Sequence, residues 1–378
     1  MPDSAESLAV QVFLGDRSYD VNVESNVLVA FVDYLETWLE ELPEVARSAK
    51  KAFVVTDKNV QPLHAVHVLS ALQKRGWKAE QFVISPGETS KSLDVISQMY
   101  DRLIAMQADR FTIVIAVGGG VVGDAAGFAA ATFARGIPFV QVPTTLLAQV
   151  DSSVGGKVGI NHPQGKNLIG AFHQPLGVLV DTSTLQTLPE RDYRSGLAEV
   201  VKYGVIFDAD FFEYLEQNIE GLNNRTPQVM RFIVAASCRF KADVVEQDEH
   251  ETTGLRACLN YGHTFAHAFE NLSGYGELLH GEAVAIGMIY ASKLAEKLEY
   301  ISSDVTQRQQ NLLEALSLPT SLPEGLSLST DNILTSMQRD KKTVGGKLRF
   351  VLPTELGKVK LFDNIPKKTV RDVIDSLL

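Results

Sequence analysis

The fold is decided by one stretch of the sequence, residues 111–130, which reads FTIVIAVGGGVVGDAAGFAA. Its first part, the continuous apolar run Phe111–Val117, is typical of a strand that is buried on both faces. The glycines that follow predict a tight turn, and the alanine-rich end predicts a buried helix. A membrane span needs about 20 consecutive lipid-tolerant residues, but Gly118–Gly120 and Asp124 interrupt the apolar region Phe111–Ala134. We therefore expect strand, turn and helix here, and no membrane-spanning segment.

Short apolar runs and helical patterns alternate on both sides of this stretch. A β-hairpin is expected near the N-terminus, where Val10–Leu14 and Tyr19–Val23 flank the turn Gly15–Arg17. Further strands are expected at Ala52–Val55, Phe82–Ser85, Phe139–Val142 and Val178–Val180. Apolar residues at helical spacing lie between several of these strands, as over residues 60–69 and 93–104. Such alternation predicts a parallel sheet that is covered by helices on both faces.

The pattern changes after Leu188. Helical patterns then dominate, at Phe211–Ile219, Val229–Val245, Ala283–Leu298 and Val305–Leu316, and a late stretch, Lys347–Leu352, alternates as a short strand would. A length of 378 residues fits about two domains. We therefore expect an α/β fold, with a Rossmann-like parallel-sheet domain over residues 1–188 and a mainly α-helical domain over residues 189–378.

Composition excludes several classes of protein. With 45% hydrophobic and 21% charged residues, the chain can fill a core, which argues against disorder. The net charge of −11 argues against a nucleic-acid binder, which needs a basic face. The two cysteines are too few for a disulfide framework, and the N-terminus lacks the features of a secretory signal, so we expect a cytoplasmic protein. Six of the eight histidines lie between His162 and His280, which is the first indication of chemistry.

The turn after the central strand fits a nucleotide-binding pattern. Gly118–Gly123 satisfies G-x-G-x-x-G between a strand and a helix, where backbone N–H groups can bind a pyrophosphate. The acidic residue expected about 20 positions later is missing, so a purely structural turn stays an alternative. Polar turns also follow three other strands, at Thr56–Asn59, Pro86–Lys91 and Pro143–Thr145. In open α/β sheets ligands bind at the carboxyl ends of strands, and we therefore expect a site at this edge.

Histidines and one acidic residue predict a metal site. His263 and His267 are four residues apart and would share one face of a helix, and His280 adds a third imidazole. Glu199 lies within an apolar stretch, where a carboxylate needs a partner. Two imidazoles and one carboxylate form a familiar catalytic zinc set, although the pattern does not say which two histidines bind. The sequence is not H-E-x-x-H, which argues against a metalloprotease.

Several basic residues could bind an anionic substrate. Asp151–Gly159 resembles a P-loop but has no Ser or Thr after Lys157, which argues against an ATPase. Any one of the basic residues could simply be solvated, but together they could hold a phosphate and a carboxylate. They are Arg135, Lys157, Lys166, Lys202, Lys241, Arg256, Lys341 and Lys342.

From Thr56 to about Leu352 the sequence resembles the 3-dehydroquinate synthase family. The resemblance rests on seven segments in order: Gly118–Asp124, Asp151–Gly159, Gly165–Phe172, Leu188–Gly204, Leu255–His267, Leu278–Met288 and Asp340–Leu352. Small departures exist at Ala266 and at Thr184–Gln186, and neither falls on a residue to which the resemblance assigns a role.

The resemblance implies a site residue by residue. Zinc or cobalt would be bound by Glu199, His263 and His280. NAD would be surrounded by Asp57, Asn59, Glu88, Lys91, Gly119, Gly120, Val121, Asp124, Thr144, Thr145 and Thr187, with Lys157 and Lys166 close to both cofactor and substrate. The substrate site would be lined by Arg135, Asp151, Lys157, Lys166, Asn167, Lys202, Lys241, Arg256, Asn260 and His267, and by Lys341 or Lys342. The family also suggests a homodimer.

The implied reaction is a lyase step of the shikimate pathway. It converts 3-deoxy-D-arabino-heptulosonate 7-phosphate, a sugar-acid phosphate, to 3-dehydroquinate and phosphate through transient oxidation by NAD, β-elimination, re-reduction, ring opening and aldol closure. His267 would handle the proton at ring opening, since an imidazole can transfer protons near neutral pH. Three alternatives remain: another sugar phosphate cyclase, a metal-dependent polyol dehydrogenase of similar fold, and a non-catalytic binding protein.

Overall fold

A computed structural model describes residues 8–40, 42–274, 277–323, 326, 328–339 and 348–378. The chain forms two compact units, which we describe separately. The first consists of Met1–Leu188 and Met230–His250, and the second of Pro189–Val229 and Glu251–Leu378. Among the described residues, no helix is both long and apolar enough to cross a membrane.

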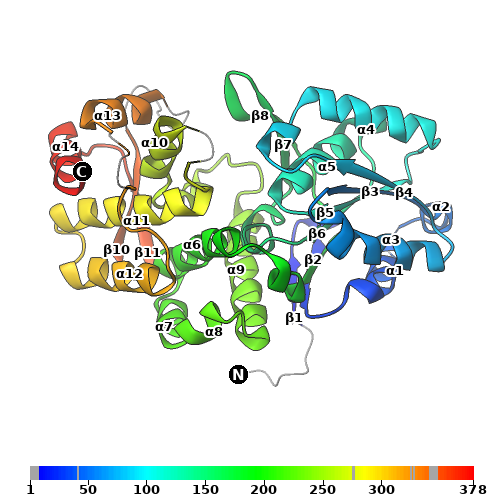
Figure 1. Cartoon of the computed structure of the whole chain (residues 1–378), viewed down its shortest axis with the longest axis horizontal. Coiled ribbons are helices and arrows are strands. Elements are labelled where there is room, and N and C mark those ends of the chain that lie inside the picture. Colours follow the sequence, from blue (N-terminus) through cyan, green and yellow to red (C-terminus); the bar gives the residue numbers. More distant parts are fainter. Residues whose placement is uncertain (1–7, 41, 275–276, 324–325, 327, 340–347) are drawn as a thin grey trace. The chain divides into compact units, whose positions relative to one another are not determined.

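The first unit is built on a seven-stranded sheet (Figure 1). Its strands, in spatial order, are β1 (Leu8–Val12), β2 (Tyr19–Glu24), β9 (Gly177–Asp181), β6 (Phe139–Pro143), β5 (Ile113–Gly118), β3 (Lys51–Asp57) and β4 (Lys78–Ile84). β1 and β2 pair antiparallel, and the other neighbours are parallel. The N-terminal hairpin and the parallel sheet expected from the sequence are thus confirmed.

Both faces of this sheet are covered, as its apolar strands predict. In β3, Ala52 and Val54 pack in one core cluster, while Phe53 and Val55 pack in another, because successive side chains point to opposite faces. Helices α1 (Phe31–Leu39) and α3 (Val66–Lys74) cover the first face, and α4 (Leu93–Ala105) and α5 (Gly120–Thr132) the second (Figure 1). A short helix, α2 (Glu44–Ala49), precedes β3.

A second hairpin in this unit was not expected from the sequence. β7 (Lys157–His162) and β8 (Gly165–Phe172) pair antiparallel as a separate two-stranded sheet. Val158 and Ile160 of β7 are buried in the core cluster that includes α5. In the sequence, Asp151–Gly159 resembles a P-loop, and its glycines are not typical of a strand. The start of β7 was therefore not recognised as a strand.

Helix α9 (Pro227–Gln247) changes the expected division of the chain. The sequence predicted one boundary at Leu188, but Met230–His250 groups with the first unit. Three bonds hold it there: Cys238 Sγ donates to the Gln149 carbonyl at 3.2 Å, Arg239 to the Gln11 carbonyl at 2.6 Å, and Lys241 to the Asp151 carbonyl at 2.6 Å. Contacts between residues about 90 or more positions apart leave no local pattern in the sequence.

The second unit is mainly helical, as expected. It contains α6 (Glu190–Phe207), α7 (Ala209–Gln217), α8 (Ile219–Asn223), α10 (His263–Ser273), α11 (His280–Lys297), α12 (Ser303–Ala315), α13 (Thr330–Arg339) and α14 (Lys367–Leu377). A hairpin of β10 (Phe350–Glu355) and β11 (Lys358–Phe362) adds one strand to the single one expected. Phe265, Phe269, Tyr290 and Phe350 form an aromatic cluster where α10, α11 and β10 meet.

Candidate functional site

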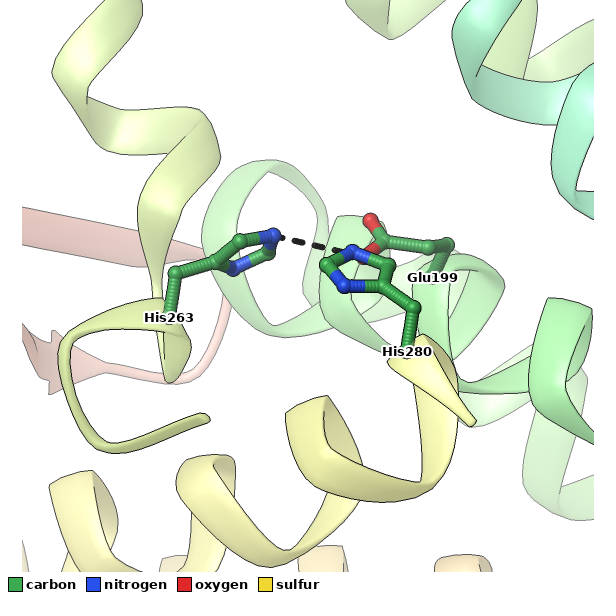
Figure 2. Close-up of side chains that lie close together, drawn as sticks. All are labelled: Glu199, His263 and His280. Atoms are coloured by element: carbon green, nitrogen blue, oxygen red, sulfur yellow. Dashed lines mark ion pairs between the residues drawn. The ribbon is translucent and has the colours of Figure 1, made fainter. Parts of the chain in front are cut away.

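Three helices of the second unit bring together a candidate metal site. Glu199 lies in α6, His263 is the first residue of α10, and His280 is the first residue of α11. One ligand atom from each lies within 4.8 Å of the others. Figure 2 shows the three side chains gathered around one point. Of the two histidines at i and i+4, only His263 belongs to this group; the His267 ring centroid lies 5.6 Å from that of His263.

The hydrogen-bonding atoms of the cluster are oriented as a metal requires. Nε2 of His263 and Nε2 of His280 each lie 3.6 Å from Oε1 of Glu199. The other ring nitrogens face acceptors: His263 Nδ1 is 3.0 Å from the Tyr261 carbonyl, and His280 Nδ1 is 3.5 Å from a Glu270 carboxylate oxygen. Ligating histidines almost always donate their second N–H in this way, which fixes the ring. The donor set therefore fits Zn²⁺ or Co²⁺.

The charge of the cluster also matters. Glu199 is 1% exposed and forms an ion pair with Lys202, which is 2% exposed. Burial would lower the pKa of His280, but the carboxylates of Glu199 and Glu270 outweigh it and raise the pKa to about 10. A bound metal needs the neutral imidazole, so proton and metal compete for this side chain.

The residue next to His280 allows this geometry. A Cβ at Gly281 would lie 1.8 Å from the carbonyl oxygen of Ser195 in α6. Only glycine therefore lets the start of α11 approach α6 four residues before Glu199. A bidentate pair between Arg191 and Glu282, at 2.7 and 2.8 Å, joins the same two helices.

The other expected site residues of the second unit lie in α10 and in the segment before it. Arg256 is buried, with Nε 3.5 Å from a Glu251 carboxylate oxygen. Asn260 ends the 3₁₀ helix η8 (Leu255–Asn260), three residues before His263. Lys341 and Lys342 lie outside the described residues.

In the first unit, the glycine turn lies between β5 and α5, as expected. Gly119 is the N-cap of α5 and provides no side-chain cap, so the first N–H groups of the helix remain for a ligand. A Cβ at Gly119 would lie 3.0 Å from the Thr145 side chain, so the glycine keeps the backbone of the turn close to Thr145. Oγ1 of Thr144 is buried without a hydrogen-bond partner among the described residues. These features fit a nucleotide phosphate.

Four of the expected residues form one polar group. Lys91, which is 4% exposed, contacts Asp124 at 2.7 Å and Glu88 at 3.3 Å and also donates to the Asn167 side chain. Burial raises the pKa of the Asp124 carboxyl, with a smaller rise from Glu88, while Lys91 and Lys241 oppose it. Lys91 therefore contacts residues of both predicted sets. Glu88 and Asp124 were expected to bind NAD, and Asn167 was expected to bind the substrate.

Other expected residues of this unit lie on neighbouring turns, on the β7–β8 hairpin and on α9. Asp57 accepts the N–H groups of Asn59 and Val60, and so stabilises its own turn. Lys241 forms an ion pair with Asp151 at 2.8 Å. Lys157, Lys166 and Arg135 are exposed.

Three residues with clear contacts to the site were missed from the sequence. His64 lies 2.8 Å from Thr187, whose hydroxyl donates to the Thr184 carbonyl, so the His64 N–H must donate to Thr187. Glu270 follows His263 by seven residues on one helix, a spacing that could have been noticed. The third, Asn161, leaves no such signal, because its contacts depend on the unexpected β7–β8 hairpin.

Two solved structures that share this architecture are sugar phosphate cyclases. A 2-deoxy-scyllo-inosose synthase complexed with carbaglucose-6-phosphate, NAD⁺ and Co²⁺ has a TM-score of 0.87 and 28% identity, covering 98% of this chain and 100% of that chain. A 2-epi-5-epi-valiolone synthase from Streptomyces hygroscopicus, with NAD⁺ and Zn²⁺ bound, has a TM-score of 0.84 and 26% identity, covering 97% and 98%. The chain therefore has the fold of this class of enzymes.

Within this class, the sequence matches one family over most of its length. The family models described as 3-dehydroquinate synthase N-terminal and C-terminal match residues 81–195 and 196–343. A 3-dehydroquinate synthase from Desulforamulus reducens is 50% identical over 365 residues, which are 97% of this chain and 99% of the relative. The chain belongs to the 3-dehydroquinate synthase family.

Proposed function

We propose that the chain converts 3-deoxy-D-arabino-heptulosonate 7-phosphate to 3-dehydroquinate and phosphate, with NAD and Zn²⁺ or Co²⁺ as cofactors. The observation that carries this proposal is the set of Glu199, His263 and His280, with the carboxylate and His263 buried and His280 half-buried, in a chain of this family. When bound, NAD supplies a transient oxidation at C5 of the substrate, and the metal acts as a Lewis acid on the C5 oxygen.

The side chains of the second unit would hold the metal and one end of the substrate. Glu199, His263 and His280 bind the metal, and Lys202 neutralises the buried carboxylate. Arg256, whose guanidinium can bind a carboxylate through two N–H groups, is suited to the substrate carboxylate. His267 transfers the proton when the ring opens, and Asn260 orients a substrate hydroxyl.

The side chains of the first unit would hold the cofactor and the substrate phosphate. The N-terminus of α5 at Gly119–Val121 binds the pyrophosphate, and the turns at Asp57 and Thr144 surround the rest of the nucleotide. Lys157, Lys166 and Asn167 lie on one hairpin and, with Arg135, bind the phosphate. Lys241, paired with Asp151, also contributes to the substrate carboxylate.

Phosphate release tests the proposal directly. The purified chain is incubated with the heptulosonate phosphate, a catalytic amount of NAD, and Zn²⁺. We expect phosphate to be released in many turnovers per NAD without net NADH, because the hydride returns to the substrate. No phosphate release, or NADH formed in proportion to turnover, would refute it.

A histidine variant tests the metal assignment. His263→Ala is expected to abolish both metal binding and turnover, while the exposed His67→Ala in α3 should change neither. Full metal occupancy in His263→Ala, measured by elemental analysis, would contradict the ligand set.

The main alternative is a cyclase that makes an inosose or valiolone product. Asn260 and His267 agree with the dehydroquinate pattern, which favours our proposal. A polyol dehydrogenase would instead accumulate NADH and would not need the hairpin lysines. Analysis of the products of the same reaction distinguishes a dehydroquinate synthase from another cyclase and from a polyol dehydrogenase.

We also propose that the enzyme works in the cytoplasm as a homodimer. The family resemblance supports the dimer, and the free thiols of Cys238 and Cys258 suit a reducing compartment. Light scattering of the purified chain tests whether it is a dimer.

A further inference from the structure

Asn161 connects two parts of the first unit that the proposed function treats separately. It lies near the end of β7, and its side chain bonds in two directions. Its amide donates to a Glu88 carboxylate oxygen at 2.9 Å, and its Oδ1 accepts the backbone N–H of Asn167 at 2.9 Å. Its own backbone N–H donates to the Lys91 carbonyl, also at 2.9 Å. One residue thus bonds both to the segment Glu88–Lys91 and to β8.

Lys91 also links the segment Glu88–Lys91 to β8, through its side chain. A lysine ammonium has three N–H donors, and three acceptors lie around this one, on Glu88, Asp124 and Asn167. The side chain is buried, so its donors are used within the protein. We call Glu88, Lys91, Asp124, Asn161 and Asn167 the polar clasp.

The clasp bonds to Asn167 through both its backbone and its side chain. Asn167 has φ of +52°, in the left-handed region that asparagine adopts more readily than most residues other than glycine. Its N–H and its side chain are both bonded within the clasp, to Asn161 and Lys91. Lys166, the adjacent residue, is exposed on the same strand. The bonds of Asn167 therefore hold the backbone next to Lys166.

We propose that Asn161 is a positioning residue, which together with Lys91 fixes Lys166 and Asn167 of the β7–β8 hairpin in the orientation that binds the substrate phosphate. This assignment rests on the proposed function for its ligand, but the structural role of Asn161 does not. The sequence predicted that Lys91 contacts NAD. In this proposal Lys91 also orients Asn167, which binds the substrate phosphate.

Hydrogen exchange and kinetics together test the role of Asn161. We compare the full-length chain with Asn161→Ala, Asn161→Asp and, as a matched control on the exposed turn of the same hairpin, Gln164→Ala. Amide exchange over residues 157–172 should be about tenfold faster in Asn161→Ala, while exchange in β5 and β6 stays unchanged. KM for the heptulosonate phosphate should rise about tenfold, with kcat within about threefold of wild type.

The aspartate variant provides the rescue. Asn161→Asp keeps the acceptor for the Asn167 N–H, and we combine it with Glu88→Gln so that an amide again donates to a carboxylate where two carboxylates would otherwise repel. In this double variant, hairpin exchange and KM should return to within about threefold of wild type. Should Asn161→Ala not fold, Lys91→Met removes the other half of the clasp and should speed up exchange over the same residues.

The outcomes separate the two proposals. Unchanged hairpin exchange, an equal increase in β5 and β6, or a loss of kcat with unchanged KM would each overturn the role of Asn161. If the wild-type chain releases no phosphate from the substrate, the proposed function fails, and the exchange experiment still decides whether Asn161 holds the hairpin.

Discussion

The nucleotide turn of the first unit and the metal cluster of the second are made of different parts of the chain. The turn is one segment, residues 118–124, and the helix that follows offers backbone N–H groups. The cluster instead needs the side chains of Glu199, His263 and His280, from three helices. A site made of backbone groups is fixed by local conformation, whereas a site made of distant side chains is fixed by helix packing.

This difference predicts different sensitivities. Changes in the turn should affect ligand affinity and leave the fold intact, because its neighbours are side chains that can move. Changes in the cluster should affect metal affinity and stability together, because its carboxylate is buried with a lysine and its helices are in direct backbone contact.

The largest effect is expected from Glu199→Ala. The substitution removes a metal ligand and leaves the Lys202 ammonium buried without its carboxylate, which should lower the free energy of unfolding by about 3–5 kcal/mol. Urea denaturation measures the loss, and elemental analysis measures the metal.

The double variant Glu199→Ala, Lys202→Met provides the control. It removes both charges and should regain more than half of the lost stability, while metal binding stays lost. If the double variant were no more stable than Glu199→Ala, the ion pair would not be what links metal binding to stability.

The fold was largely predictable, because its signals are local. Continuous apolar runs such as Val114–Val117 indicate strands, and helical spacing indicates helices, without any tertiary information. The β7–β8 hairpin and the placement of Met230–His250 were not predictable in this way. The glycines in and around the hairpin weaken its strand pattern. The placement of Met230–His250 depends on long-range hydrogen bonds such as that from Cys238 to the Gln149 carbonyl.

The candidate site divides similarly. The glycine turn and the pair His263 and His267 stand out as motifs, but the residues alone could not say that His280, and not His267, joins Glu199. That choice is made by α11, whose Gly281 packs on Ser195. Asn161 contacts Asn167, and Glu270 contacts His280. Contacts of this kind can be recognised only in the three-dimensional structure.

A pair of glycine variants tests the comparison most directly. Gly281→Ala would bring a methyl group against the Ser195 carbonyl, where the backbone must shift, and should lower stability by about 1–3 kcal/mol and weaken metal binding. In Gly119→Ala the nearest atoms to the new methyl group belong to the Thr145 side chain, and the φ of −78° is one that alanine adopts, so stability should fall by about 1 kcal/mol or less. Nucleotide affinity should nevertheless decrease. Equal losses of stability in thermal unfolding would break the distinction between the two regions.

A smaller effect is expected from Glu270→Gln. Glu270 faces His280 Nδ1 at 3.5 Å, and loss of its charge should raise the dissociation constant for Zn²⁺ about 10- to 100-fold. A competition assay with a chromophoric chelator measures this. The exposed Glu314→Gln on α12 is the control and should bind metal as the wild type does. Unchanged affinity in Glu270→Gln would exclude an orienting role.

The smallest effect is expected from Lys91→Met, and it should depend on pH. Asp124 is 22% exposed and faces Lys91, Glu88 and Lys241, and burial already raises the pKa of its carboxyl. Without the Lys91 ammonium that pKa should rise further. A carboxyl with a raised pKa holds its proton more tightly in the folded state, so stability decreases as pH rises from the unfolded-state pKa to the folded-state pKa.

The stability deficit of Lys91→Met relative to wild type should therefore be about 1 kcal/mol near neutral pH and shrink toward acidic pH. Urea denaturation across this pH range measures it, with the exposed Lys58→Met as a control that should show no such trend. A deficit that stays constant with pH would mean that Lys91 stabilises the turn by packing alone. The nucleotide region would then depend on side-chain packing as the metal cluster does, and the contrast between backbone and side-chain construction would weaken.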